Sequence, residues 1–482
     1  MTENSRKESL FRSLIGRAET YNLVGKSKEA INDLSMCMEV VKSMADRKFE
    51  AKCLLQLTEV YGSISKYKEM LSYAKKLLLL SKEMSDKKGE AESFENIGYV
   101  HYMLGEYSKA IRYFTRSLKI FEETRYREGQ ARILNNIGST HDSLGNYPKA
   151  LEYYIRSLKI FEKIDNREDQ ARSFNNIGSV YDTFGDYSKA LKYYIQALKI
   201  FEEIGYRAGQ ARLLNNIGFI YSNLSEYSKT LEYYTRALKI REEIDDHQGQ
   251  AYTFNNIGYV YACFGDYPKA LEYYAKSLRI YGRLGYQYGQ ALCLNNIGRV
   301  HLEDKNYGLA RQYSISARKI AQGIKAKEIL QRIYLSFGEL EMVQNKTKKG
   351  KEYIEKALKL AKELNIKSGI SQALLLQARI EAIVGGTSSA DTRWQIANCK
   401  FKEAIKLFEK LKQPFELGKA YYYYGEALKK CNVHPPYCVA DQLSDKTEAT
   451  EYLQKAKEIF EKIGARVWLK KTQDLIGQIL NR

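Results

Sequence analysis

Residues 170–209 read QARSFNNIGSVYDTFGDYSKALKYYIQALKIFEEIGYRAG, and the asparagine-glycine spacing inside this stretch recurs every 40 residues along the chain. At each recurrence an asparagine stands two residues ahead of a glycine, or of the glycine's equivalent position. The asparagines concerned are Asn96, Asn136, Asn176, Asn216, Asn256 and Asn296. All but the first follow a second asparagine, namely Asn135, Asn175, Asn215, Asn255 and Asn295. A fixed period of this length is typical of a stacked-repeat protein, in which each unit buries its apolar face against the next.

The apolar residues of this stretch predict two helices per repeat. A first helix covers residues 171–181 at helical spacing and is broken at Gly185 and Asp186. A second helix is expected from Ser188, its predicted cap, to Gly205, and Pro148 and Pro268 occupy the same register in sister repeats, where a proline in the first turn is tolerated. Small residues at the helix contact allow the two helices to approach closely, and the large aromatic residues fill the space between layers.

This pattern resembles the tetratricopeptide repeat, in the 40-residue form of the Pins-type polarity adaptors and rapsyn, and more loosely that of kinesin light chain. The matching positions are Phe174, Gly178, Tyr181, Ala190, Tyr194 and Ala197. The proline that closes the common 34-residue version is missing. The resemblance implies an all-α fold, a right-handed superhelical α-solenoid of about 11 helix pairs with a C-terminal capping helix.

Sliding the register by 40 residues predicts the organisation of the whole chain. The expected segments are an N-terminal tail over 1–10, two degenerate units over 11–90, six regular units over 91–330, a degenerate ninth unit over 331–370, two units over 371–464 with inserted loops at 386–399 and 431–446, and a capping helix over 465–482.

Composition favours a cytoplasmic helical protein. The chain has 5 prolines among 482 residues, and it contains no run of 18 apolar residues that would predict a membrane span. Its N-terminus is polar and charged, so no signal peptide is expected. The 7 cysteines are scattered and fit reduced core residues better than a disulfide framework.

The basic charge is concentrated in the last third of the chain. Residues 305–482 hold 33 Lys and Arg against 19 Asp and Glu, a surplus of 14 out of the net +19. Such a surplus can attract acidic proteins, nucleic acid or an anionic surface. Solvated helix faces explain it equally well, because the lysines are interspersed with glutamates.

The resemblance also implies a binding face. In this repeat family the first helix of each pair lines the concave groove, and an asparagine amide offers one acceptor and two donors to a peptide backbone. Arginines stacked in the same register favour a peptide that carries carboxylates or a phosphate. The candidate peptide-binding residues are Asn96, Arg132, Asn135, Asn136, Asp142, Arg172, Asn175, Asn176, Asp182, Arg212, Asn215, Asn216, Asn255, Asn256, Asn295 and Asn296.

Two alternatives for these residues stay open at this point. The asparagines can serve to bond neighbouring helices, and the arginines can serve solubility. At one position of the face, the small Ser139 and Ser179 are replaced in other repeats by Tyr99, Phe219, Tyr259 and Arg299. The groove is therefore expected to be polar in its middle and more aromatic toward both sides.

Motifs for catalysis or a cofactor are not found. His101, His141 and His301 take the place of a tyrosine in sister repeats and are expected to be core or groove-edge aromatic residues. Cys431, His434 and Cys438 form one weak candidate metal site, and a disulfide or a plain loop explains them as well.

The function predicted from these observations is a non-enzymatic scaffold or adaptor. It would hold an extended segment of a protein partner, with no cofactor and no membrane span. Two alternatives are a regulatory or sensor subunit of a signalling complex, with its enzyme on a separate chain, and a regulator that touches nucleic acid through the basic last third.

Overall fold

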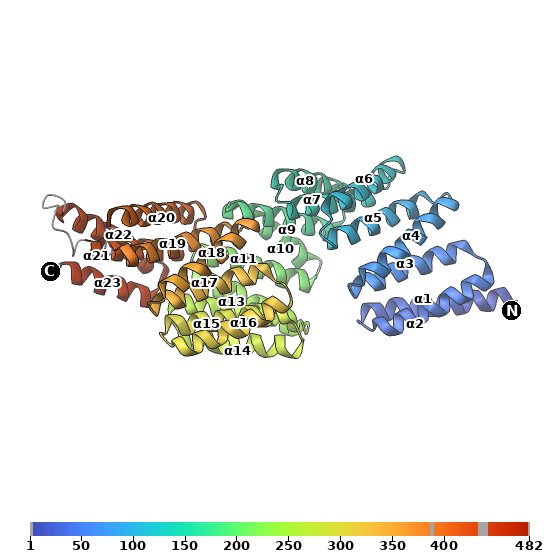
Figure 1. Cartoon of the computed structure of the whole chain (residues 1–482). Coiled ribbons are helices and arrows are strands. Elements are labelled where there is room, and N and C mark those ends of the chain that lie inside the picture. Colours follow the sequence, from blue (N-terminus) through green and yellow to red (C-terminus); the bar gives the residue numbers. More distant parts are fainter. Residues whose placement is uncertain (1–2, 386–389, 432–441, 481–482) are drawn as a thin grey trace. The chain divides into compact units, whose positions relative to one another are not determined.

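The computed structural model describes residues 3–385, 390–431 and 442–480, and within them the chain forms helices joined by short turns. The helices follow one another in antiparallel pairs (Figure 1). The chain divides into two compact units, Met1–Ile204 (unit 1) and Gly205–Arg482 (unit 2). The expectation of an all-α solenoid is confirmed.

Unit 1 holds five helix pairs. Its helices are α1 (Glu3–Leu23), α2 (Ser27–Met44), α3 (Arg47–Ser63), α4 (Tyr67–Glu83), α5 (Lys87–Met103), α6 (Tyr107–Glu123), α7 (Arg127–Ser143), α8 (Tyr147–Lys163), α9 (Arg167–Phe184) and α10 (Tyr187–Glu203). Because α1 begins at Glu3, most of the segment predicted as an N-terminal tail over 1–10 is helical. The predicted cap Ser188 is also corrected: the Asp186 carboxylate accepts a hydrogen bond from the Lys189 N–H, so the cap lies two residues earlier.

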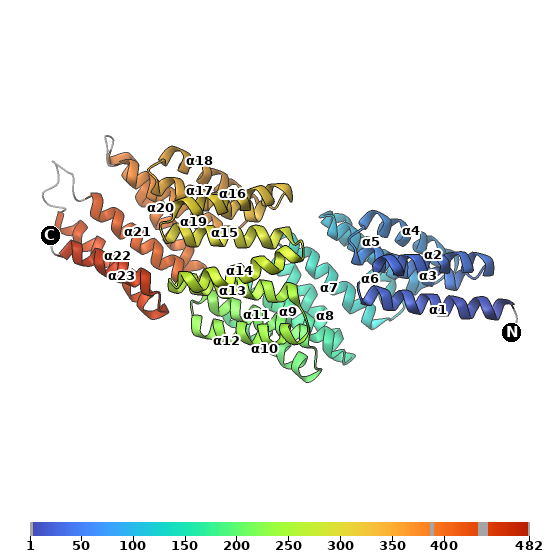
Figure 2. The same cartoon turned by 90° about the horizontal axis from the view of Figure 1, so that it is seen from below.

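The described residues of unit 2 form six pairs and a final helix, and the course of these helices can be followed in Figure 2. Its helices are α11 (Arg207–Asn223), α12 (Tyr227–Glu243), α13 (His247–Phe264), α14 (Tyr267–Arg283), α15 (Gln287–Glu303), α16 (Tyr307–Gly323), α17 (Lys327–Val343), α18 (Thr347–Glu363), α19 (Lys367–Gly385), α20 (Ala390–Lys410), α21 (Pro414–Cys431), α22 (Gln442–Ile463) and α23 (Arg466–Leu480). Helix α20 begins inside the loop predicted at 386–399, and α22 begins inside the one predicted at 431–446, so both predicted loops are too long at their C-terminal ends.

The turns between consecutive helices share one geometry from α1 to α19. A residue with positive φ stands at every twentieth position from Gly25 to Asn365. After α9, the N–H groups of Gly185 and Asp186 donate to the carbonyl oxygens of Asp182 and Tyr181 at 2.8 and 2.9 Å. These bonds satisfy carbonyl groups that a helix end otherwise leaves free.

The repeated glycine marks the place where the two helices of a pair touch. A β-carbon built on Gly178 would lie 2.8 Å from the ring of Tyr194 and 3.3 Å from the carbonyl oxygen of Ala190. Gly138 has the same relation to Tyr154, at 2.8 Å. The packing role expected for this glycine is therefore confirmed, and it fixes the orientation of the rest of the first helix.

Replacing Gly178 by alanine is expected to destabilise the protein by about 1–3 kcal/mol, because the buried ring of Tyr194 has no room to retreat. The same substitution at Gly16 in α1 is the matched control, since an added β-carbon there meets nothing within 4 Å. Gly16→Ala is expected to stabilise by roughly 0.5–1 kcal/mol through helix propensity. Urea unfolding followed by circular dichroism measures both, and a stabilising Gly178→Ala would contradict the packing argument.

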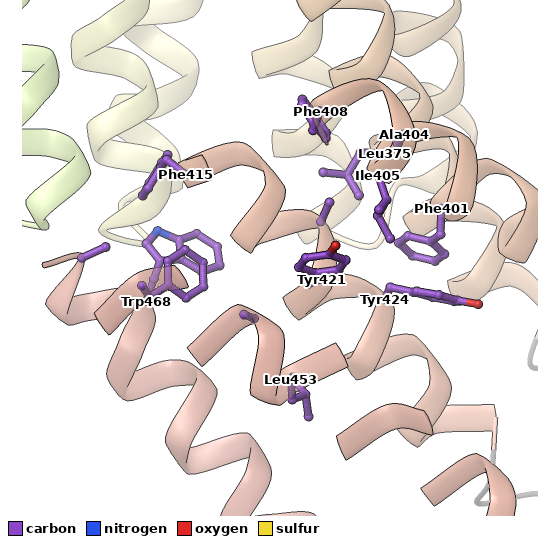
Figure 3. Packing of buried hydrophobic residues seen from close by; sticks show 14 of the residues in the cluster. Leu375, Phe401, Ala404, Ile405, Phe408, Phe415, Tyr421, Tyr424, Leu453 and Trp468 are labelled. Carbon is purple, nitrogen blue, oxygen red and sulfur yellow. The ribbon is translucent and has the colours of Figure 1, made fainter. Parts of the chain in front are cut away.

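The largest apolar core of the described residues belongs to unit 2. It joins side chains of α12 and α13 with those of α19 to α23, and Figure 3 shows Phe401, Tyr424, Phe415 and Trp468 within it. Helix α23 thus caps the last layer as predicted, with Trp468 buried, and it also takes part in a core that extends to α13.

No helix of the described residues is at once long enough and apolar enough to cross a membrane.

Candidate functional site

We call the side of the first helices that bears the paired asparagines the asparagine face. In unit 1 it is formed by α5, α7 and α9. Glu95 of α5 accepts a bidentate pair of hydrogen bonds from Arg132 of α7, with Nε–Oε1 at 2.8 Å and Nη2–Oε2 at 2.7 Å. Asn136 Nδ2 donates to the same carboxylate at 3.1 Å. Arg132 and Asn136 therefore tie one repeat to the preceding one.

Asparagine pairs with asparagine at the next repeat boundary. Asn176 Nδ2 of α9 donates to Asn135 Oδ1 of α7 at 3.0 Å, and Asn175 Nδ2 donates to Asn176 Oδ1 at 3.3 Å. All four asparagines of α7 and α9 are half-buried, as is Asn96 of α5. In unit 1 these amides therefore do bond neighbouring helices, which is the alternative raised above. They are also partly exposed, so a ligand could still contact them.

The first asparagine of each pair is buried in unit 2. Asn215, Asn255 and Asn295 are 2%, 5% and 1% exposed. Asn255 Oδ1 accepts from Asn296 Nδ2 at 2.9 Å, and Asn295 Oδ1 accepts from Ser336 Oγ at 3.1 Å. Packing thus shields these three amides: Asn255 and Asn295 bond to a neighbouring repeat, while Asn215 Oδ1 and Asn295 Nδ2 are buried without a hydrogen-bond partner among the described residues.

The second asparagine of each pair keeps partial exposure in unit 2. Asn216, Asn256 and Asn296 are half-buried. Within the described residues, the Nδ2 atom of Asn256 is buried without a hydrogen-bond partner. An amide that is buried and unpaired costs stability, so this N–H is a group that an added acceptor would satisfy.

The predicted arginine row does not form three equivalent free cations. Arg132 is paired with Glu95 across the repeats, and Arg172 is paired with Glu168 of its own helix at 3.2 Å from Nε to Oε1. Arg212 in unit 2 is exposed. In unit 1 both arginines of the row are therefore paired with a glutamate.

Two carboxylates on the asparagine face of unit 1 lie in partly desolvated positions. Asp142 and Asp182 are half-buried, and neither forms an ion pair within the described part of this unit. Burial raises the pKa of Asp142, and it raises the pKa of Asp182 to about 6. These side chains would gain from a ligand that donates hydrogen bonds or brings positive charge.

Aromatic rings add exposed surface to the same face. Tyr99 in unit 1 is 40% exposed, and Phe219 and Tyr259 in unit 2 are 43% and 38% exposed, at the register where Ser139 and Ser179 stand elsewhere. Tyr252, which the sequence did not single out, is 40% exposed. Its position in the repeat could have identified it, because Tyr252 is equivalent to Arg132 and stands one helix turn before the paired asparagines.

Glu95 is the other residue that the sequence reasoning missed. Glu95 occupies the position at which five sister repeats carry their first asparagine. This departure from the repeated asparagine was the sequence signal that could have identified it. Its carboxylate accepts both Arg132 and Asn136.

The asparagine face of α13 and α15 is covered by C-terminal helices. A cavity of about 50 Å³ lies there, and it is bordered by residues of the face and by residues of α21 and α23. The residues of the face are Tyr259, Cys263, Asn296, Arg299 and Glu303, and the covering residues are Phe415, Glu416, Lys419 and Trp468. Asn296 is thus placed under a cover that the sequence did not predict.

The three histidines are packed as aromatic rings, as predicted. His101, His141 and His301 stack on Tyr113, Tyr153 and Tyr313 with ring centroids 5.3, 5.5 and 5.5 Å apart. Burial lowers the pKa of His141 and of His301.

Metal-binding clusters of three or more His, Cys, Asp or Glu are not found among the described residues. His434 and Cys438 of the weak candidate site lie outside those residues, and nothing is described of the Cys431 side chain.

Family models of the tetratricopeptide repeat match residues 91–124, 129–203 and 209–283. The narrower likeness to Pins-type adaptors, rapsyn and kinesin light chain stays a prediction. No curated protein matches the chain.

The solved structures that resemble the chain include three with TM-scores above 0.5. A Rap protein complexed with competence and sporulation factor is 13% identical, with a TM-score of 0.52 over 74% of this chain and 98% of that one. Aspartyl phosphate phosphatase F from Bacillus subtilis is 13% identical, with a TM-score of 0.51 over 75% and 94%. A signal transduction ATPase with numerous domains and a tetratricopeptide repeat sensor, from Pyrococcus horikoshii, is 16% identical, with a TM-score of 0.52 over 76% of this chain and 54% of that one. At such identities the likeness extends to the fold alone.

Proposed function

Because residues 91–124, 129–203 and 209–283 are tetratricopeptide repeats, we propose that the chain is a non-enzymatic protein-interaction scaffold that acts in the cytoplasm. Its ligand is an extended segment of a partner protein, held on the asparagine face of unit 1. The residues that hold it are Asn136 and Asn176, with Asn96, Asn135 and Asn175 beside them.

The observation that carries this proposal is the partial use of each amide. Asn136 donates one hydrogen bond to Glu95, and Asn176 donates one to Asn135. An asparagine amide has two N–H donors and an oxygen with two lone pairs, so hydrogen-bonding capacity remains on a half-buried side chain. The bonds between repeats hold each amide in place, which lowers the entropy that a ligand has to remove.

The spacing of the repeats suits an extended ligand. Neighbouring helices pack about 8–10 Å apart, and an extended chain advances about 3.3 Å per residue. One asparagine then meets roughly every third residue of the bound segment. Backbone recognition of this kind tolerates variation in the partner's side chains.

The charges of the face guide the choice of partner. To bind Arg132, an acidic or phosphorylated segment would have to break the ion pair between Arg132 and Glu95. By contrast, burial raises the pKa of Asp142 and of Asp182, so a ligand that donates hydrogen bonds or carries positive charge would stabilise their carboxylates. We therefore propose that unit 1 prefers a neutral or basic segment. The exposed Arg212 of unit 2 is the better candidate for an acidic or phosphorylated group.

A second form of the proposal is a regulatory or sensor subunit whose enzyme is a separate chain. One protein of the same fold is described in complex with competence and sporulation factor, and another is described as carrying a tetratricopeptide repeat sensor. Both forms require the same ligand-binding face.

The double variant Asn136→Ala with Asn176→Ala tests the site. We expect about tenfold weaker binding of a partner segment selected from a peptide library, since each lost hydrogen bond contributes ~0.5–1.5 kcal/mol. Fluorescence anisotropy of the labelled segment gives the dissociation constants.

Asn296→Ala is the matched control. It removes the same kind of bond between repeats, to Asn255 Oδ1, at a position that α21 and α23 already cover. Binding is expected to be unchanged in this variant. Unchanged binding by a folded double variant, or an equal loss in Asn296→Ala, would rule out the site on unit 1.

A further inference from the structure

The cavity beside α21 and α23 in unit 2 is lined by charged and aromatic side chains. Residues of α13, α14 and α15 line it together with residues of α21 and α23. Its volume of about 50 Å³ has room for roughly three to five water molecules. Tyr259 on its border is 38% exposed, so the cavity is open to solvent in the structure as it stands. A small ligand can therefore reach it while the apolar core around Trp468 stays packed.

Among the described residues that line this cavity, four are charged, and two of these pair with each other. Lys419 of α21 lies 3.5 Å from Glu303 of α15, and Lys471 of α23 lies 3.6 Å from the same carboxylate. Lys419 is 5% exposed, so its ammonium group depends on this partner for its charge. Glu303 and Lys419 therefore need no further ligand.

The other two charged residues, Arg299 and Glu416, have no such partner. Both side chains are half-buried, and neither forms a hydrogen bond or an ion pair with any residue that the structure describes. Two further carboxylates that act on Arg299 are already engaged, since Glu303 binds the lysines and Glu339 binds Arg379 at 2.6 Å. The hydrogen-bonding capacity of the Arg299 guanidinium is thus left unused by the described residues.

Arg299 and Glu416 nevertheless act on each other through the cavity. Burial by itself would lower the pKa of Arg299, but the negative charges around it, Glu416 foremost, outweigh burial and raise this pKa. Arg299 belongs to α15 and Glu416 to α21, and their charged groups lie farther apart than the ~4 Å of an ion pair. Two opposite charges therefore line one space without meeting.

The chemistry of the two groups defines the ligand that fits between them. A guanidinium donates paired hydrogen bonds to a carboxylate, and a carboxylate accepts hydrogen bonds from an ammonium group. A ligand with a single charge would leave that charge in surplus at a partly desolvated site, which is unfavourable. A zwitterion supplies both charges and leaves the charge balance of the cavity unchanged.

The size and the apolar lining of the cavity restrict the zwitterion further. The ammonium group, α-carbon and carboxylate of a free amino acid need about the room of a few water molecules. Phe415 and Trp468, with ring centroids 6.5 Å apart, form an apolar wall beside the charged groups (Figure 3). Sites for small ligands typically combine such walls with a few placed polar groups. A side chain of the ligand would extend toward the exposed ring of Tyr259.

Arg299 also departs from the repeated sequence. The preceding repeats carry an uncharged residue at its position, namely Tyr99, Ser139, Ser179, Phe219 and Tyr259. The packing of the repeat therefore does not require an arginine here. This separates Arg299 from the asparagines beside it, which recur in every neighbouring repeat.

We propose that this cavity, the zwitterion pocket, binds a free α-amino acid, with the ligand carboxylate on Arg299 and the ligand ammonium group on Glu416. The pocket gives the scaffold a small-molecule ligand in addition to its protein partner. It belongs to unit 2 and does not depend on peptide binding by unit 1, so either proposal can fail alone.

Glycine is the probe, because it is this zwitterion without a side chain, and Trp468 is the reporter, because it lines the pocket. The full chain has 2 tryptophans, so the background variant Trp394→Phe leaves Trp468 as the only source of tryptophan emission. We expect glycine to change this emission in a saturable way. N-acetylglycine keeps only the carboxylate and glycinamide keeps only the ammonium group. At equal ionic strength each should bind at least about tenfold more weakly than glycine.

Arg299→Gln and Glu416→Gln, each made in the same background, remove one charge and keep a polar side chain. Each should weaken glycine binding at least about tenfold. Arg283→Gln is the matched control, because Arg283 is exposed in the last turn of α14 and does not line the pocket. Glycine binding should be unchanged in this variant. Circular dichroism establishes that each variant is folded, and the comparison of the three ligands needs none of these substitutions.

Three results would overturn the zwitterion pocket. Trp468 emission without a saturable response to glycine would mean that the space holds water alone. Binding of N-acetylglycine or glycinamide as tight as that of glycine would mean that one charge is unused, and that the end of a peptide fits the site as well as a free amino acid. Unchanged glycine binding in folded Arg299→Gln or Glu416→Gln would place the ligand elsewhere.

Discussion

Arg379→Ala is expected to destabilise unit 2 by about 3–5 kcal/mol, because it leaves the carboxylate of Glu339 buried without its partner. The Arg379 Nη1 atom lies 2.6 Å from Glu339 Oε1, and the two side chains are 13% and 17% exposed. The guanidinium also lies 3.6 Å from the ring centroid of Tyr423. Urea unfolding at pH 7 measures the loss.

The pH dependence of this variant identifies the cause. Burial by itself would raise the pKa of Glu339, but Arg379, with Lys419 and Arg299, outweighs it and lowers the pKa to about 2. In the wild type the pair therefore stabilises unit 2 above the ordinary pKa of 4.5, and this stability is lost as the pH falls toward 2. In Arg379→Ala the pKa should rise instead, so acid should reduce the difference between variant and wild type.

Lys351→Ala is the control for a surface ion pair. Lys351 contacts Glu381 at 2.9 Å but is 50% exposed, so its loss should cost less than about 1 kcal/mol. The additional substitution Glu339→Gln should recover part of the stability lost in Arg379→Ala. A cost for Arg379→Ala no greater than that for Lys351→Ala would show that Glu339 is effectively solvated.

Trp468→Ala is expected to lower stability by about 3–5 kcal/mol, as large-to-small substitutions in a core do. The ring is 3% exposed and packs against Tyr422 and Phe460, and against Phe415, which lies beside it in Figure 3. Trp468→Phe keeps most of the apolar volume and should cost much less.

Trp394→Ala is the comparison for the second tryptophan, which is half-buried at the border of the same core. Thermal unfolding by circular dichroism should place its effect well below that of Trp468→Ala. Equal effects would mean that the core around Trp468 is not the one that stabilises this end of unit 2.

The repeated side chains made the helices and their pairing predictable from sequence. The repeated glycine requires a close neighbour, and an aromatic ring supplies it at 2.7–2.9 Å in five of the six regular repeats, whereas Gly298 meets Ser314 Oγ at 3.1 Å. A contact that recurs every 40 residues leaves a periodic signal. The face that we propose to bind a partner was chosen from the same register, together with the resemblance to a known repeat, and it stays a prediction.

Contacts that occur once left no such signal. Glu303 and Lys419 are 116 positions apart and belong to no repeated pattern, so the cover over α15 was invisible in the sequence. The burial of Asn255 and Asn295 could not be predicted either, because the equivalent asparagines Asn135 and Asn175 are only half-buried. Whether such an asparagine is buried or half-buried depends on how the neighbouring repeats pack around it, and the periodic sequence pattern carries no information on that packing.

The turns described above have a backbone period of 20 residues, half that of the sequence. The connection within a pair and the connection between pairs therefore both place a residue of positive φ at the same point of the turn. Side chains, such as Asn176 on one row of helices and Tyr194 on the other, distinguish the two rows. The difference between the two rows of helices is therefore carried by their side chains, on a chain path whose positive-φ turns recur twice in each repeat.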